Sequence, residues 1–168
     1  MCIRDRYYTS TSFSDTINIT GGENRAYTLT ELRPYTNYTV TVSAYNDVGT
    51  GPTSDNRIQQ TEQAEPGVVS NLMSSGSDVD QISITWNQPS MPNGIIIMYD
   101  IRYRESNNSD SFIHVNTTNT EHTISGLLPN TSYTVGVRAY TIAGPGEWTD
   151  ETAMTLSLIH ISEPTRPY

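Results

Sequence analysis

Histidine and aspartate side chains are the residues of this chain that could bind a metal ion or transfer protons. His114 and His122 lie in the second half, and Asp78 and Asp80 form a short acidic pair. A zinc site needs about four ligands, and a calcium site needs about six to eight oxygen atoms. Neither group has such spacing, so we interpret the histidines as solvated edge-strand residues and the aspartates as a turn. We expect no metal.

Motifs for nucleophilic or phosphate chemistry are also absent from the sequence. There is no Gly-x-Ser-x-Gly, no His-Glu-x-x-His and no glycine-rich loop that precedes a helix. The glycines at Gly49, Gly51, Gly144 and Gly146 stand between predicted strands, where their ordinary role is to permit positive φ. We therefore expect no catalytic residue, no cofactor and a function that is not enzymatic.

Three arginines and one tryptophan are expected to share a face of one sheet. Arg102 and Arg104 alternate with apolar residues, Arg138 does the same on a later strand, and Trp148 opens the strand after that. A guanidinium group over an exposed aromatic ring gains about 0.5–1 kcal/mol. We interpret these four residues as a candidate interaction face for another protein or a neighbouring module.

Five asparagines stand in glycosylation sequons, which are acceptor sites only in secreted chains. Two of them fall in or beside predicted loops, and two others lie just before a predicted strand. The candidate sites are Asn18, Asn37, Asn107, Asn116 and Asn130. Their placement favours an extracellular or cell-surface location.

The charge of the chain excludes two classes of partner. It has no lysine, and its formal net charge is -9. Nucleic acids and anionic membrane surfaces bind basic patches, so we expect neither as a partner. No apolar run approaches the length of a membrane span, although a membrane anchor elsewhere in the parent protein is compatible with this sequence.

An internal repeat organises the elements that must position these residues. Residues 32–45 and 127–140 read almost alike, and every match is 95 positions apart, as for Tyr38 and Tyr133. The same offset continues into the glycines that follow. A repeat of this length corresponds to one sandwich domain rather than to a solenoid unit.

Apolar and polar residues alternate within the repeat, which is typical of half-buried strands. Turn signals rich in Pro, Gly and Asn separate these runs. The pattern predicts an all-β fold, an antiparallel sandwich with almost no helix. The expected strands are 68–73, 81–86, 98–104, 112–115, 122–124, 133–140 and 147–155, and in the first half 16–19, 27–30, 38–45 and 55–60.

The second half resembles a fibronectin type III domain. The resemblance rests on Trp86 in the second strand, Leu127-x-Pro129 before Tyr133, and Gly-x-Gly after the sixth strand. It implies seven strands, a tyrosine corner and no disulfide. The structural core residues are expected to be Trp86, Tyr133, Tyr38, Leu127 and Leu32.

The repeat offset predicts that the first half is cut. Residues 66–155 are expected to form a complete module, and residues 7–62 the C-terminal part of another, without its first two strands and most of the third. Residues 61–66 form a short linker that ends in proline. The positions equivalent to the arginine face are Tyr7, Thr9, Ser43 and Thr53, so that face belongs to the second module alone.

Both ends of the chain match no sandwich pattern. Residues 1–6 and 156–168 resemble translated sequencing-library adapters, so we expect both tails to be non-native. They contain the single cysteine, Cys2, and a third histidine, His160. Without the three arginines and two acidic residues of the tails, the net charge is still -10.

These observations favour a non-catalytic binding or spacer module of a cell-surface receptor or adhesion protein. Its fold is similar to modules of receptor-type tyrosine phosphatases and matrix proteins, which implies other proteins or neighbouring modules as partners. An accessory module of a secreted enzyme and a spacer of an intracellular muscle-type array are the alternatives. A glycan on Asn116 or Asn130 would favour the first class over both.

Overall fold

The computed structural model describes residues 2–9, 14–19 and 26–157, and its regular elements are all β-strands. The chain divides into two compact units, unit 1 over residues 1–63 and unit 2 over residues 64–168. Unit 1 contains β1 (Cys2–Thr9), β2 (Ser14–Ile19), β3 (Asn37–Asn46), β4 (Gly49–Thr53) and β5 (Arg57–Gln60). Unit 2 contains β6 (Ser70–Ser77), β7 (Gln81–Asn87), β8 (Met98–Glu105), β9 (Ile113–Thr117), β10 (Glu121–Ser125), β11 (Ser132–Thr141), β12 (Gly144–Pro145) and β13 (Thr149–Met154). No helix in these residues is long and apolar enough to cross a membrane.

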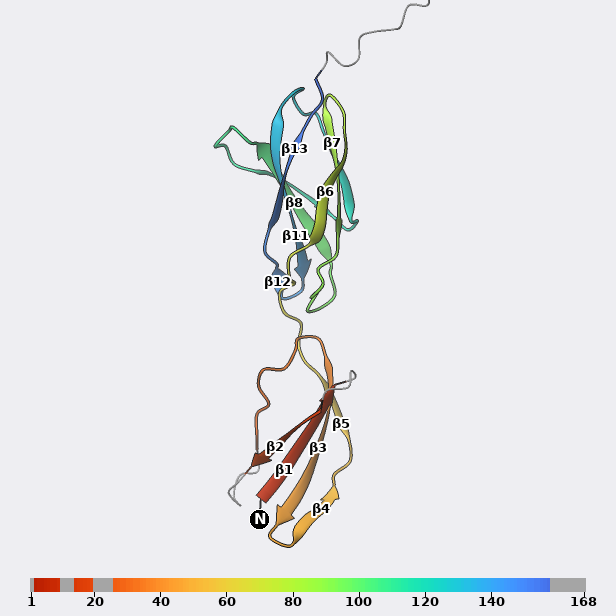
Figure 1. Ribbon diagram of the computed structural model, residues 1–168, viewed down its shortest axis with the longest axis vertical. Helices are drawn as coiled ribbons and strands as arrows, with labels where there is room; N and C mark the ends of the chain where they lie inside the picture. The colour runs from red at the N-terminus through yellow and green to blue at the C-terminus, as the bar shows by residue number, and fades with distance from the viewer. Residues whose placement is uncertain (1, 10–13, 20–25, 158–168) are drawn as a thin grey trace, which may run out of the picture. The chain divides into compact units, whose positions relative to one another are not determined.

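Unit 2 is a sandwich of two antiparallel sheets (Figure 1). One sheet has the order β10-β7-β6. In the other, β9, β8, β11 and β12 follow one another and β13 also pairs with β11. The predicted all-β antiparallel fold is confirmed, and the alternation that predicted each central strand also sets which of its faces is buried.

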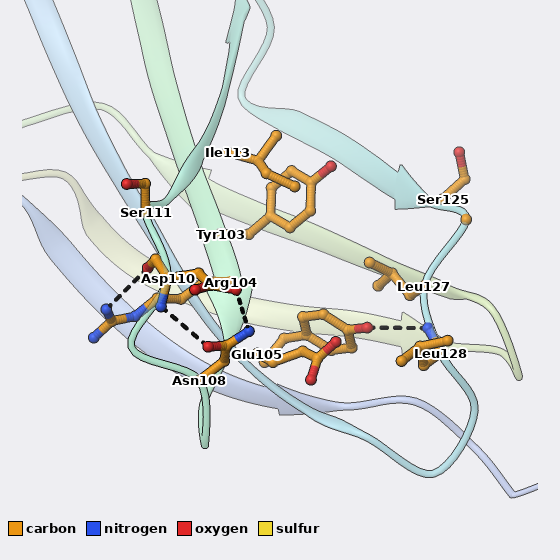
Figure 2. Close-up of a pocket in the computed structure, with 12 residues that line it drawn as sticks. Tyr103, Arg104, Glu105, Asn108, Asp110, Ser111, Ile113, Ser125, Leu127 and Leu128 are labelled. Carbon is orange, nitrogen blue, oxygen red and sulfur yellow. Dashed lines mark hydrogen bonds between the residues drawn. The ribbon is translucent and has the colours of Figure 1, made fainter.

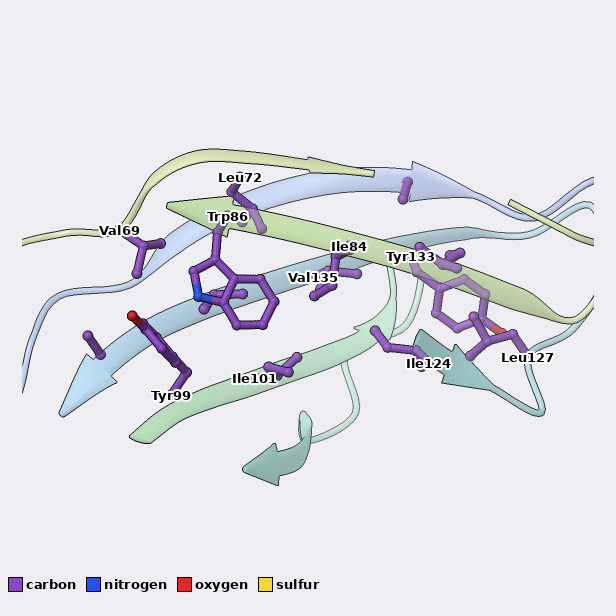
Figure 3. Close-up of a cluster of buried hydrophobic side chains, with 14 residues drawn as sticks. Val69, Leu72, Ile84, Trp86, Tyr99, Ile101, Ile124, Leu127, Tyr133 and Val135 are labelled. Atoms are coloured by element: carbon purple, nitrogen blue, oxygen red, sulfur yellow. The ribbon is translucent and has the colours of Figure 1, made fainter. Parts of the chain in front are cut away.

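The core of unit 2 lies between its two sheets. Ile82, Ile84 and Trp86 of β7 face Ile101, Val135 and Val137 of the other sheet, and none of these six side chains is more than 3% exposed. Figure 3 shows the indole of Trp86 next to the ring of Tyr99, and the two rings meet edge to face with centroids 5.4 Å apart. Burying side chains of this size is the main stabilising contribution to such a domain.

A tyrosine holds the corner that leads into the sixth strand of the sandwich. Tyr133 is 5% exposed, and its hydroxyl accepts a hydrogen bond of 3.0 Å from the backbone N–H of Leu128. The same bond occurs in unit 1, where Tyr38, 4% exposed, accepts from the N–H of Arg33 at 2.8 Å. Leu127 is buried beside the first corner, whereas Leu32, its equivalent in unit 1, is half-buried.

Tyr99 carries a titratable hydroxyl into the core. Burial raises the pKa of this hydroxyl above its ordinary value, and the side chain of Gln88, which lies near it without meeting hydrogen-bond geometry, lowers the pKa by less. The unfolded chain ionises at an ordinary pKa of about 10. The folded unit is therefore expected to keep a proton that the unfolded chain has lost.

We expect the free energy of unfolding of unit 2 to decrease at alkaline pH, and we expect this decrease to be smaller in the variant Tyr99→Phe. The stability that depends on protonated Tyr99 is fully present below about pH 10 and is lost as the pH rises through the raised pKa of the folded state. Urea unfolding followed by tryptophan fluorescence measures it, because Trp86 and Trp148, the only tryptophans, both lie in unit 2. An identical pH slope for the variant and the parent chain would contradict this assignment.

Unit 1 has a single described sheet, with the order β2-β1-β3-β4 and β5 paired to β3. Its pairing matches that of the sheet of unit 2 that contains β8 and β11. The inner face of β3 is open in the described part of the chain: Val42 is 40% exposed, whereas its repeat equivalent Val137 is fully buried. Part of this apolar face is therefore in contact with water.

The strand predicted at residues 27–30 does not form. This segment has no strand pairing, and Tyr27 is 51% exposed. Its equivalent in unit 2 is β10, which pairs with β7. No described residue of unit 1 supplies a strand equivalent to β7, so the backbone groups of 27–30 have no partner strand and the apolar alternation alone is not enough.

Part of each predicted tail makes backbone hydrogen bonds with the unit next to it. β1 begins at Cys2 and pairs with β3, and Leu156 bonds through its backbone to Asp78 and Asn130. Backbone pairing does not depend on side chains, so the non-native origin of residues 1–6 and 156–168 stays a prediction. Residues 158–168, which include His160, lie outside the described residues.

Candidate protein-contact face

The outer face of the larger sheet of unit 2 carries charged and aromatic side chains in register. Alternation along β8 points Ile101 to the core and Asp100, Arg102 and Arg104 to the opposite face. Arg102 stands opposite Gly136 of β11, and Gly136 stands opposite Asp150 of β13. Three adjacent strands therefore bring these side chains into one patch.

Six side chains on this face stack as alternating rings and guanidinium groups, which we call the arginine ladder. In order they are Tyr140, Arg138, Trp148, Arg102, Phe112 and Arg104. The Cζ atoms of Arg138 and Arg102 lie 4.3 and 4.1 Å from the centroid of the Trp148 ring. Arg102 and Arg104 lie 4.6 and 4.4 Å from the centroid of Phe112, and Arg138 lies 5.1 Å from that of Tyr140. These distances fall within the range of cation–π attraction.

Asp100 anchors the ladder from beneath. It is only 4% exposed, and its carboxylate accepts from Arg138 Nη2 at 2.9 Å and from Arg138 Nε at 3.2 Å. The side chain of Arg138 is itself 22% exposed. A desolvated carboxylate needs such charged partners, so Asp100 fixes the guanidinium of Arg138 against the indole.

A second carboxylate, that of Asp150, holds Arg102 in place. Asp150 accepts from Nη2 of Arg102 at 2.8 and 3.0 Å through its two oxygens. Gly136 lies beneath this pair, and a Cβ atom there would stand 2.9 Å from Nε of Arg102 and would collide with Asp150. The absence of a side chain at Gly136 is what lets the ion pair lie flat on β11.

His114 joins this cluster rather than standing alone. Its Nδ1 lies 3.0 Å from Oδ1 of Asp100, and its ring meets that of Trp148 edge to face at 5.8 Å. A carboxylate only accepts, so Nδ1 carries the proton. His114 lies on an outer strand with its side chain half exposed, as predicted, but the prediction missed its contact with the buried aspartate.

The structure brings together all four residues proposed from the sequence. Arg102 and Arg138 share Trp148, while Arg104 reaches the ladder through Phe112. Sequence reasoning missed Phe112, Tyr140, Asp100, Asp150 and His114. The alternation of side chains along the predicted strands was the available signal. Residues two positions apart point to the same face, so Asp100 shares a face with Arg102, and His114 shares one with Phe112.

The remaining candidates, apart from Asn116, lie away from the ladder. Asp78 and Asp80 form a turn, in which the N–H of Asp78 bonds to Gln81. No group of three or more His, Cys, Asp or Glu within residues 2–9, 14–19 and 26–157 has metal-binding geometry. All five sequon asparagines are exposed, and Asn116 stands opposite Asp100 on the outer face, at the edge of the ladder.

Unit 1 has no ladder at the equivalent described positions. Ser43 and Thr53 stand opposite each other where Arg138 and Trp148 stand in unit 2. Neither can make a cation–π contact. The two units therefore share a scaffold and differ in what their outer face presents.

Comparison with known proteins places this scaffold. The family profile of the fibronectin type III domain matches residues 5–60 and 67–155. Ephrin type-A receptor 4-A of Xenopus laevis is 34% identical over 136 residues, which are 78% of this chain and 14% of that protein. Neural cell adhesion molecule L1 of Takifugu rubripes is 31% identical over 76% of this chain and 10% of its own length.

The fold comparison gives the same result. The crystal structure of the extracellular region of rat CD45, domains d3-d4, superposes with a TM-score of 0.69 at 23% identity, over 86% of this chain and 77% of that one. The chain thus spans only a small part of the curated relatives it matches, which are receptors and adhesion proteins. With two matched stretches and the same sandwich topology, this chain belongs to the fibronectin type III domain family.

Proposed function

We propose that this chain is a non-catalytic protein-binding or spacer part of the extracellular region of a receptor or adhesion protein, and that the arginine ladder is its contact face. The single observation that carries the proposal is the ladder itself. Trp148 lies between two guanidinium groups on an open sheet face, and Asp100 and Asp150 hold those groups, of Arg138 and Arg102, in place.

The composition of the ladder suits protein recognition. Tryptophan, tyrosine and arginine are the side chains that dominate binding energy at protein interfaces. Their ordering in the free module lowers the entropy lost on association, because the rotamers are already fixed by ion pairs. The relatives supply the context: a receptor and a neural adhesion molecule contain the most similar stretches reported above.

We expect Trp148→Ala to abolish binding of the chain to cells that display its partner while unit 2 stays folded. The indole contacts two guanidinium groups, so its loss should cost about 1–2 kcal/mol of stability and leave Arg102 and Arg138 without the ring between them. Flow cytometry with a multimeric form of the chain measures binding, and tryptophan fluorescence of the remaining Trp86 measures folding.

The matched control is Met73→Ala, since Met73 is 58% exposed on β6 of the other sheet. Binding that survives Trp148→Ala would remove the ladder from the proposal.

Removal of N-glycans from the natural protein tests its location: a shift in mobility that requires Asn116 or Asn130 supports an extracellular module. Absence of any glycan would favour a spacer of an intracellular array or a bacterial accessory module.

A further inference from the structure

A cavity of about 450 Å³ opens where the free edges of the two sheets of unit 2 approach each other. It lies between the end of β8, the start of β9 and the corner after β10 (Figure 2). Both β9 and β10 are outer strands of their sheets in the described residues. This cavity shares Arg104 with the ladder but none of the other five ladder residues.

One part of the cavity wall is apolar and partly open to water. Leu127 and Tyr133 form its buried floor, while Ile113 and Leu128 at its mouth are 54% and 56% exposed. Figure 2 shows Ile113 beside Tyr103 and Leu127 beside Leu128 around the opening. Two large aliphatic side chains with more than half of their surface in water would gain from contact with the hydrocarbon stem of a ligand.

A carboxylate without a counterion lines the same cavity. Glu105 is half-buried and its carboxylate makes no hydrogen bond or ion pair within the described residues. A second carboxylate of the lining, Asp110, accepts from the amide of Asn108 at 2.6 Å. The lining cation, Arg104, is engaged elsewhere, because it donates to the carbonyl of Asp110 and covers the ring of Phe112. Two carboxylates and one guanidinium group give the lining a net charge of -1.

We propose that this cavity binds a lysine or arginine side chain of an extended segment of a partner protein. The apolar part of the wall fits the alkyl stem of such a side chain, and Glu105 fits its charged end. Charge complementarity selects this occupant: the chain has no lysine and a net charge of -9, so a basic segment is attracted and an acidic one is repelled. The site goes beyond the proposed function, since it does not require the ladder to be the contact face.

Methyl NMR of the full chain with three blocked peptides of one extended sequence tests the proposal. The peptides differ only in a central lysine, leucine or glutamate. The lysine peptide is expected to shift the methyl signals of Ile113 and Leu128 in a saturable way, and added salt should weaken its binding. The variant Glu105→Gln should weaken binding about tenfold, which corresponds to the loss of one hydrogen bond between charged groups.

Glu121→Gln is the matched control, because Glu121 is an exposed carboxylate on β10, outside this cavity, and should leave lysine-peptide binding unchanged. Trp148→Ala should also leave it unchanged, so that failure of the ladder and failure of this site can be told apart. Equal binding of the leucine or glutamate peptide overturns the proposal. So does unaltered binding by Glu105→Gln, the absence of saturable shifts at millimolar peptide, or shifts that depend on protein concentration alone and indicate a second copy as occupant.

Discussion

Amide hydrogen exchange of the 168-residue chain is expected to protect β7, β8 and β11 of unit 2 at least about a thousandfold more than β3 of unit 1. A thousandfold difference in protection corresponds to about 4 kcal/mol of opening free energy. The comparison is internal, because both units are read in one sample under one set of conditions.

The physical reason is the missing half of the core. In unit 2, Val137 and Val135 are fully buried against the second sheet. In unit 1 the equivalents Val42 and Val40 have no second sheet in the described residues, and Val42 is 40% exposed. Each large apolar side chain that stays in water forgoes about 1.5–3 kcal/mol, and a whole domain is stable by only about 5–15 kcal/mol.

Limited proteolysis gives an independent check. Cleavage should begin in unit 1, and a fragment close to residues 64–157 should persist with the fluorescence of a buried Trp86. Equal protection of β3 and β11 would show that one sheet is sufficient, and the energetic argument would then be wrong. If the parent protein supplies the missing strands upstream, a longer chain that includes them should raise the protection of β3 to that of β11.

Strand positions were readable from the sequence where alternation was long and the partner strand was present. The predicted strand at 133–140 is β11, and the one at 81–86 is β7. The prediction failed at residues 27–30, where the alternation is as clear as elsewhere. A strand needs hydrogen bonds from another strand, and no local pattern shows whether that partner exists.

The ladder was readable only in part for a similar reason. Side-chain alternation placed Arg102, Arg138 and Trp148 on one face, because alternation can be read from each strand by itself. The contact of Phe112 with Arg102 depends on where the β8–β9 hairpin brings β9 back alongside β8, which the intervening loop decides. The burial of Asp100 follows from side chains of β9 and β11 that cover it, and composition gives no sign of that.

Arg138→Ala is expected to destabilise unit 2 by about 3 kcal/mol or more, the cost of leaving a buried carboxylate without its main cation. The carboxylate in question is that of Asp100, whose side chain is 6% exposed. The hydrogen bond from His114 to Asp100 remains in this variant and keeps the loss of stability close to that lower value. Urea unfolding followed by tryptophan fluorescence measures the change.

Arg102→Ala is the matched control on the same face. Its partner Asp150 has a side chain that is 43% exposed and can return to water, so the ion pair contributes only about 0–1 kcal/mol. Loss of the stacking contacts adds about 1 kcal/mol. Two arginines that look equivalent in the sequence should therefore differ by at least about 1 kcal/mol in the free energy of unfolding.

A double variant separates the buried charge from the packing of the arginine. Asp100→Asn together with Arg138→Met removes both charges and keeps most of the volume, so stability should return to within about 1 kcal/mol of the parent chain. If the double variant is as unstable as Arg138→Ala, the cost lies in lost stacking on Trp148 and Tyr140 rather than in the stranded carboxylate. If the double variant is instead as stable as the parent chain, Asp100 serves to orient the ladder without stabilising the fold, which is what a face kept for recognition requires.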